Sequence, residues 1–291
     1  MFKRIAIFSQ NSDERTLASL KELAELLYSK GVEFFLFEKS SGVPLCHSGN
    51  MKRFGDIGAL SPPPDLVLSV GGDGTFLETM LRVREYGIPV AGINTGRLGF
   101  LANIPGEDVA MAIDMLFGGR YRIVKRALLK SEEPAALFGD KSAYALNEIT
   151  VQKSDLNMIT IRVYIDGVHL NTYWADGLII STATGSTAYN LSVGGPILSP
   201  EDTSIIIAPI SPHNLTIRPI VVAGSSTVNM VVEGRGREYL VTCDFRWTKL
   251  PFSNGITIRQ PSEKLATIVP EGSDFFSTLR TKLMWGADKR N

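Results

Sequence analysis

The sequence predicts an α/β N-terminal domain with a parallel sheet, followed by an antiparallel β-rich C-terminal domain. Three observations support this prediction. In the first 120 residues, continuous apolar runs alternate with stretches of helical periodicity, which is typical of strands covered on both faces by helices. Beyond residue 120, short β-branched runs separated by turns take over. The length of 291 residues also fits two domains.

The N-terminal elements follow a βαβ order that predicts a Rossmann-like sheet. Asp13 is the expected cap of a helix that runs to Gly31. The segment 40–64 is rich in Gly, Ser and Pro and predicts a loop with at most a short helix. Strands are expected at 4–8, 33–38, 65–70 and 89–94, and two further helices at 75–87 and 107–117.

The C-terminal half reads as a series of short strands. Asp166 and Gly167 predict the turn of a hairpin over residues 160–170. A terminal helix is expected after Ser273 as its cap, and we expect it to pack back on the first domain. Phe276, Leu279 and Leu283 would form its apolar face. Further strands are expected at 177–182, 204–210, 227–232, 238–244 and 255–260. The predicted domains are therefore residues 1–120, completed by 273–291, and residues 121–272.

Composition excludes several classes of function. Thirty basic and thirty acidic side chains balance, which gives no reason to expect a nucleic-acid or membrane partner. The two cysteines, Cys46 and Cys243, are too few for a disulfide framework, and no Cys/His spacing fits zinc. The longest aliphatic run, 205–210, is too short to span a bilayer. We therefore expect a cytoplasmic protein.

The stretch "SVGGDGTFLETML", residues 69–81, is the first candidate site. It lies between a predicted strand and a predicted helix, where α/β sheets bind ligands and where glycines let phosphate approach backbone N–H groups. It is neither a P-loop, which needs a lysine after its last glycine, nor a GxGxxG fingerprint. Because a carboxylate repels phosphate, Asp73 is expected to do chemistry or to hold a cation. The alternative is a capping aspartate in a tight turn.

Two more polar segments predict a nucleotide site. Residues 174–198, "WADGLIISTATGSTAYNLSVGGPIL", offer hydroxyls, backbone donors and an aromatic ring, and residues 145–150, "ALNEIT", contain an adjacent Asn and Glu. Each segment has a plainer interpretation as a turn of small residues or an unremarkable dipeptide. Together with the glycine loop, they are expected to converge on one cleft.

These motifs resemble those of bacterial NAD kinases. The shared segments are "GGDGT" at 71–75, "NTGRLGFL" at 94–101, "LNEI" at 146–149, "DGLIISTATGSTAYNLSVGGPI" at 176–197 and "PISPHNLTIRPIV" at 209–221. The resemblance implies transfer of the terminal phosphate of ATP to the 2′-hydroxyl of the adenosine ribose of NAD. It also implies a divalent cation, chiefly Mg²⁺, and a homodimer or homotetramer.

The resemblance also implies roles for individual residues. Asp73 matches the general base that accepts the proton of the ribose hydroxyl. The expected cofactor-binding residues are Gly71, Gly72, Gly74, Thr75, Phe100, Asn147, Glu148, Trp174, Asp176, Thr187, Ala188, Tyr189, Asn190, Ser192 and Arg246. Trp174 and the pair Phe245 and Arg246 depart from the residues common in the family. His213 matches a family histidine, although a histidine between prolines also suits a structural role.

The sequence also allows two other functions. Lipid kinases of the diacylglycerol type share the GGDGT loop, but the Thr, Ser and Asn-rich segments favour a polar substrate. A non-catalytic NAD-binding sensor is the other alternative, and the intact acidic and amide residues argue against it.

Overall fold

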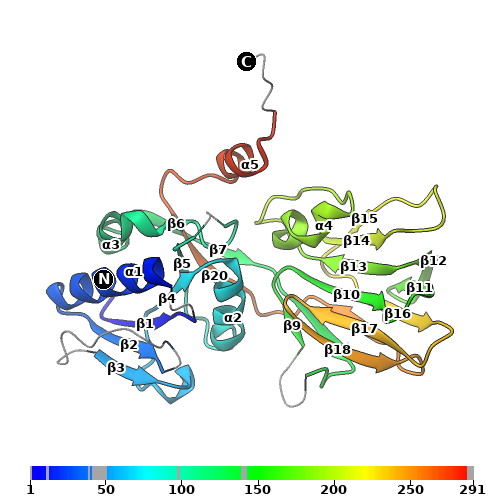
Figure 1. Cartoon of the computed structure of the whole chain (residues 1–291), viewed down its shortest axis with the longest axis horizontal. Coiled ribbons are helices and arrows are strands. Elements are labelled where there is room, and N and C mark those ends of the chain that lie inside the picture. The colour runs from blue at the N-terminus through cyan, green and yellow to red at the C-terminus, as the bar shows by residue number, and fades with distance from the viewer. Residues whose placement is uncertain are drawn as a thin grey trace. The chain divides into compact units, whose positions relative to one another are not determined.

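The computed structural model describes residues 2–10, 13–38, 40, 51–96, 99–138 and 143–286. The chain folds into two compact units (Figure 1). The first contains residues 1–125 and 265–291, and the second contains residues 126–264. Among the described residues, no helix is both long and apolar enough to cross a membrane.

The first unit contains an eight-stranded sheet in the order β3-β2-β1-β4-β5-β20-β7, with β6 also paired to β5. The pairs among β1 to β6 are parallel, and β20 runs parallel to β5. The predicted α/β class is therefore confirmed. The strands are β1 (Arg4–Phe8), β2 (Glu33–Phe37), β3 (Met51–Phe54), β4 (Leu66–Gly71), β5 (Val90–Asn94), β6 (Ile104–Pro105), β7 (Tyr121–Arg126) and β20 (Leu265–Pro270).

Three α-helices accompany this sheet: α1 (Glu14–Ser29), α2 (Asp73–Val83) and α3 (Val109–Phe117), with the short 3₁₀ turns η1 (Ile57–Ala59) and η2 (Gly106–Asp108). The predicted cap of α1 is confirmed, because Asp13 accepts a hydrogen bond from the Thr16 N–H at 3.0 Å. Strands β1 and β4 are neighbours at the centre of the sheet. From β1 the chain continues to β2 on one side, and from β4 it continues to β5 on the other side. Right-handed crossovers then place α1 and α2 on opposite faces, and the end of β4 lies at the switch point where ligands bind.

Two local predictions in this unit are wrong. Strand β3 lies within the segment predicted as a loop. Its sequence, MKRF, is short and half charged, so it does not look like a strand, and it pairs only with β2 at the edge of the sheet. Helix α2 begins at Asp73 rather than at residue 75, and it ends at Val83 rather than at residue 87. Within the same predicted loop, the turn η1 is the short helix that the prediction allowed, and residues 41–50 lie outside the described residues.

The first unit also takes in β7 and β20, which the sequence-based boundaries assign to the second domain. Strand β20 is almost entirely buried and pairs with β5 through Thr267 and Val90. Its apolar run looks the same in sequence whether it joins a parallel or an antiparallel sheet. Only the return of the chain to the first sheet decides where it belongs.

The second unit consists of two six-stranded sheets, ordered β15-β14-β13-β10-β17-β18 and β12-β11-β16-β19-β8-β9. Every strand pair described within them is antiparallel, which confirms the predicted β-rich class. The strands are β8 (Leu129–Glu133), β9 (Tyr144–Ala145), β10 (Glu148–Lys153), β11 (Ile159–Ile165), β12 (Val168–Ala175), β13 (Gly177–Ser181), β14 (Ile205–Ile210), β15 (Ile220–Val222), β16 (Val228–Glu233), β17 (Glu238–Cys243), β18 (Arg246–Pro251) and β19 (Ile256–Arg259).

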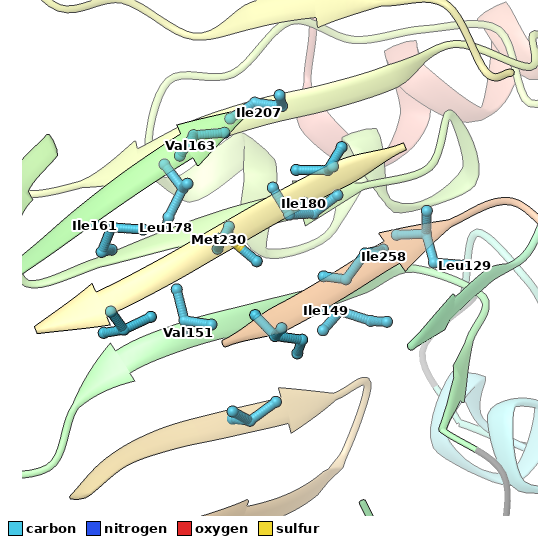
Figure 2. Packing of buried hydrophobic residues seen from close by; sticks show 14 of the residues in the cluster. Leu129, Ile149, Val151, Ile161, Val163, Leu178, Ile180, Ile207, Met230 and Ile258 are labelled. Atoms are coloured by element: carbon cyan, nitrogen blue, oxygen red, sulfur yellow. The ribbon is translucent and has the colours of Figure 1, made fainter. Parts of the chain in front are cut away.

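The core of the second unit is formed by aliphatic side chains of both sheets (Figure 2). Ile149, Val151 and Ile180 come from one sheet, and Ile161 and Met230 come from the other, all almost fully buried. Alternate residues of these strands point inward, as expected for a sandwich of half-buried strands. This core packs against β10 and β13, whose ends carry the polar motifs.

The predicted hairpin is confirmed, whereas the predicted cap and apolar face of the terminal helix are partly wrong. Asp166 and Gly167 both have positive φ, 51° and 83°, which confirms the turn between β11 and β12. Helix α5 (Phe275–Leu283) is capped by Asp274, not by Ser273, because the Asp274 carboxylate accepts the Ser277 N–H at 2.8 Å. The expected apolar face is also wrong in part, since Phe276 is 65% exposed and only Leu279 is buried.

Candidate active site

The glycine loop joins the end of β4 to the start of α2. Gly71 has a φ of +150°, and a Cβ on it would lie 2.4 Å from Thr75 Oγ1, so both conformation and space require glycine. Thr75 itself is buried beneath the loop. A Cβ on Gly72 or Gly74 would meet no described atom within 4 Å. The backbone of these two glycines is therefore accessible to a ligand at a helix N-terminus, where anions are favoured.

Asp73 is held in a fixed position by a second backbone segment. Its carboxylate accepts hydrogen bonds from the N–H groups of Phe100 at 2.9 Å, Leu101 at 3.2 Å and Ala102 at 3.0 Å. A Cβ on Gly99 would lie 1.6 Å from Asp73 Oδ1. The structure thus brings the predicted residues Asp73 and Phe100 together. The Asp73 carboxylate can come this close to the 99–102 backbone only because residue 99 is glycine.

Lys282 is a further residue near this loop, and it is not among the residues predicted from the sequence. Its ammonium lies 5.1 Å from the centre of the Phe100 ring. Burial lowers the pKa of Lys282, and the nearby Asp73 carboxylate acts in the opposite direction. No motif marks Lys282, because it belongs to an ordinary amphipathic helix far along the chain.

In the second unit, Asn147 and Glu148 stand at the start of β10 and are held by Asp244. The Asp244 carboxylate accepts the N–H groups of Leu146 at 2.8 Å, Asn147 at 2.8 Å and Glu148 at 3.2 Å. Asp244 occupies the turn between β17 and β18 with a φ of 53°. Asp244 could not be predicted from the sequence, since an aspartate in a two-residue turn is common and its partners lie far away in sequence.

Glu148 is a buried carboxyl with unusual electrostatics. Burial, together with the neighbouring Asp244 carboxylate, raises the pKa of Glu148 to about 8, against the opposing effect of the Tyr189 N–H. Burial also raises the pKa of Asp244 to about 6. Glu148 Oε2 is buried and has no hydrogen-bond partner among the described residues. A buried oxygen of this kind fits a hydroxyl of a bound ligand.

The polar loop after β13 is fastened to the Asn147 segment. Thr182 Oγ1 donates to the Leu146 carbonyl at 2.6 Å and accepts the Gly185 N–H at 3.0 Å. The loop continues through η3 (Thr184–Thr187) and α4 (Tyr189–Ser192). Within the second unit, the structure therefore brings Asn147, Glu148 and the start of α4 together, as expected for these two segments.

The residues of this loop differ in their accessibility. Asn190 is fully buried and donates to the carbonyls of Ser186 at 3.1 Å and Pro196 at 3.0 Å. Its position indicates that it shapes the loop. Thr187 and Ala188 are half-buried, while Tyr189 and Ser192 are exposed.

Trp174 lies on β12 of the other sheet, and Asp176 lies just before β13, at the end of that strand far from Glu148. Glu148 pairs with Ser181, whereas Asp176 precedes Gly177 at the other end of β13, a separation along the strand of about 15 Å. Asp176 forms an ion pair with Lys153 at 2.7 Å. Within the second unit, the structure does not bring Trp174 and Asp176 to Asn147 and Glu148.

Arg246 and His213 are engaged in local contacts. The Arg246 guanidinium lies 4.6 Å from the centre of the Phe138 ring and donates to the Tyr144 carbonyl. The His213 N–H donates to the Trp174 carbonyl at 2.8 Å, and the residue is exposed. These contacts are structural ones within the second unit.

Comparison with known proteins decides the family. Residues 63–121 match the ATP-NAD kinase N-terminal domain, and residues 146–269 match the ATP-NAD kinase C-terminal domain. The NAD kinase of Flavobacterium psychrophilum is 39% identical over 293 residues, covering 99% of this chain and 100% of that protein. The chain belongs to the NAD kinase family. The resemblance inferred from the motifs is therefore confirmed.

Other NAD kinase relatives and solved structures agree. The NAD kinase of Bacteroides fragilis is 46% identical over 231 residues, 78% of each chain. The crystal structure of yeast NADH kinase complexed with NADH has a TM-score of 0.85 at 21% identity and covers 98% of this chain and 89% of that one. An Archaeoglobus fulgidus NAD kinase in complex with ATP has a TM-score of 0.74 at 24% identity, covering 96% and 99%. These two structures share the NAD kinase fold with this chain.

Proposed function

We propose that this protein transfers the terminal phosphate of ATP to the 2′-hydroxyl of the adenosine ribose of NAD, which yields NADP. Family membership and the NAD kinase name of relatives that span the whole chain support the proposal. The observation that carries it is the position of Asp73, a fixed carboxylate beside a glycine backbone that is open to phosphate.

Asp73 is the proposed general base. A carboxylate has about four lone-pair sites, and backbone N–H groups occupy three of them here. One site remains to accept the hydrogen bond of a ribose hydroxyl. As the bond from that oxygen to phosphorus forms, its proton passes to Asp73, and the bond from phosphorus to the ADP oxygen breaks. The three N–H groups keep the carboxylate oriented throughout.

Asn147 and Glu148 are the proposed partners of the ribose hydroxyls of NAD. Because its pKa is raised to about 8, Glu148 is largely protonated at neutral pH and can donate a hydrogen bond as well as accept one. Tyr189, Thr187, Ala188 and Ser192 provide the accessible surface of the adjoining loop. Asn190 is proposed to act by holding that loop rather than by touching the dinucleotide.

The divalent cation implied by the family, Mg²⁺, fits a site formed mainly by nucleotide phosphates. Among the described residues there is no group of three or more His, Cys, Asp or Glu side chains that could hold a metal ion. Mg²⁺ usually enters such sites with one or two carboxylates and the substrate phosphates. Asp73 is the carboxylate within the glycine loop. When bound, the ion would neutralise charge on the transferring phosphate.

We further propose that the protein is cytoplasmic and forms a homodimer or homotetramer. Large apolar side chains are exposed on both edge strands of one sheet of the second unit, with Ile220 and Val221 on β15 and Trp247 on β18. Exposed apolar edges favour association with another chain. Light scattering coupled to size-exclusion chromatography measures the oligomer directly.

A substrate panel tests the proposed function. The purified protein is incubated with ATP or inorganic polyphosphate as donor, and with NAD, NADH or diacylglycerol as acceptor, each with Mg²⁺ or Mn²⁺. An NADP-specific dehydrogenase then detects the 2′-phosphorylated product. We expect NADP from NAD and ATP. Phosphorylation of diacylglycerol alone would support the lipid kinase, and NAD binding without product would support the sensor.

A further inference from the structure

The terminal helix brings a lysine to the glycine loop. Lys282 lies in the last turn of α5, and its ammonium sits 5.1 Å from the centre of the Phe100 ring. The N–H of Phe100 in turn donates to the Asp73 carboxylate. Lys282 therefore touches the segment that orients Asp73, and all three residues belong to the first unit.

The ammonium of Lys282 is partly removed from solvent without a close anion. Burial is the main influence on the pKa of Lys282 and lowers it, while Asp73 raises it. Among the residues that the structure describes, Lys282 forms no ion pair within 4.0 Å and no hydrogen bond. A contact with the Phe100 ring compensates only part of the lost hydration. An incoming anion would therefore gain an ionic partner there.

The glycine loop itself lacks such a cation. In a P-loop, a lysine within the motif reaches the phosphates, whereas this loop carries Asp73, whose charge repels them. We propose that Lys282 binds the polyphosphate of the nucleotide and provides the cation that the glycine loop lacks. This proposal deepens the proposed function and rests on it, because it assumes that the loop receives a nucleotide triphosphate.

The alternative is that Lys282 has only a structural role and does not bind phosphate. The four-carbon stem of Lys282 covers apolar surface near Phe100 whether or not the ammonium binds phosphate. The variant Lys282→Met keeps a stem of similar length and removes the charge. The variant Lys282→Arg keeps the charge. Arg280→Met is a matched control, because Arg280 is an exposed cation on the same helix, and its charge helps to lower the pKa of Asp274 at the helix N-terminus.

Calorimetric titration of the full-length protein with inorganic tripolyphosphate tests the proposal. We expect Lys282→Met to weaken binding about tenfold or more, as loss of a charge-assisted contact does. The affinity of Lys282→Arg for tripolyphosphate should stay within about threefold of the wild-type value. Arg280→Met should bind tripolyphosphate as tightly as the wild type does. Affinity for NAD should be equal in all four proteins.

The proposal would be overturned if Lys282→Met binds tripolyphosphate like the wild type, if Arg280→Met loses as much, or if the wild type does not bind it. NADP formation is measured in parallel on the same proteins. A wild type that binds tripolyphosphate through Lys282 but makes no NADP contradicts only the proposed function. A wild type that makes NADP, with the KM for ATP unchanged in Lys282→Met, contradicts only the role of Lys282.

Discussion

The carboxylate of Asp73 fills the space that a side chain on Gly99 would occupy. A Cβ at position 99 would lie 1.6 Å from Asp73 Oδ1. The next three residues donate their N–H groups to the same carboxylate. Glycine at position 99 therefore decides where the proposed base stands.

The substitution Gly99→Ala should displace Asp73 while leaving the sheet intact. A shift of about 1 Å in a reacting group costs on the order of a hundredfold in rate, so we expect kcat for NADP formation to fall by about that factor. Gly96→Ala is the matched control, since a Cβ there comes no closer than 3.8 Å to any atom of the described residues. Equal kcat values in the two variants would refute the positional role of Gly99.

The raised pKa of Glu148 should make the stability of the protein depend on pH. Its pKa is about 8 in the folded protein and near the ordinary glutamate value of about 4.3 when unfolded. Between these two pKa values the folded state retains a proton that the unfolded state has lost. The free energy of unfolding is therefore highest below pH ~4.3 and decreases as the pH rises toward about 8.

The variant Glu148→Gln cannot lose that proton. Its melting temperature relative to the wild type should therefore rise as the pH increases from 5 to 8, as measured by differential scanning fluorimetry. The exposed Glu238→Gln on β17 serves as the control and should show no such trend. A difference between Glu148→Gln and the wild type that does not change with pH would show that Glu148 ionises normally.

Asp244 is predicted to position Asn147 and Glu148. Asp244→Asn keeps a residue that tolerates the left-handed backbone, but leaves at least one buried N–H without an acceptor. We expect a loss of about 1–3 kcal/mol in the free energy of unfolding and an increased KM for NAD.

Asp166→Asn provides the control for Asp244→Asn. Asp166 also has positive φ, 51°, and accepts a backbone N–H, that of Thr227 at 2.8 Å, but it lies in the β11–β12 hairpin. Its substitution should reduce stability without changing the KM for NAD. An increased KM in both variants would indicate a general effect of destabilisation.

Removal of divalent cations should stop catalysis without unfolding the protein. The described residues contain no cluster of metal-binding side chains, so the ion is expected to arrive with the nucleotide. Excess EDTA should abolish NADP formation, and the melting temperature of the protein without nucleotide should stay unchanged. A large fall in melting temperature would instead indicate a resident metal in the protein.

The class of each domain could be predicted from local patterns, whereas contacts across the sequence could not. Asp13 and the turn at Asp166 act on their immediate neighbours, and both predictions were confirmed. Strand β20 depends on pairing with β5 at the other end of the chain, and no periodicity encodes that partner. The edge strand β3 was missed because its few charged residues resemble a loop.

The candidate site shows the same division. The glycine motif and the Asn147 segment are local patterns and were recognised from the sequence. Asp244 and Lys282 act on segments far away in sequence, and neither belongs to a pattern of its own. The separation of Asp176 from Glu148 follows from strand register, which the sequence alone does not fix.

The most direct test of the proposed mechanism compares Asp73→Asn with the wild type in the assay for NADP formation. Asparagine preserves the shape of the side chain but cannot accept the proton of the ribose hydroxyl at neutral pH. We predict that kcat falls by at least about a hundredfold, while NAD affinity remains close to that of the wild type. The melting temperature should fall modestly, because the amide leaves at least one of the three donating N–H groups without an acceptor. A variant that forms NADP at the wild-type rate would contradict the role of Asp73 as the base.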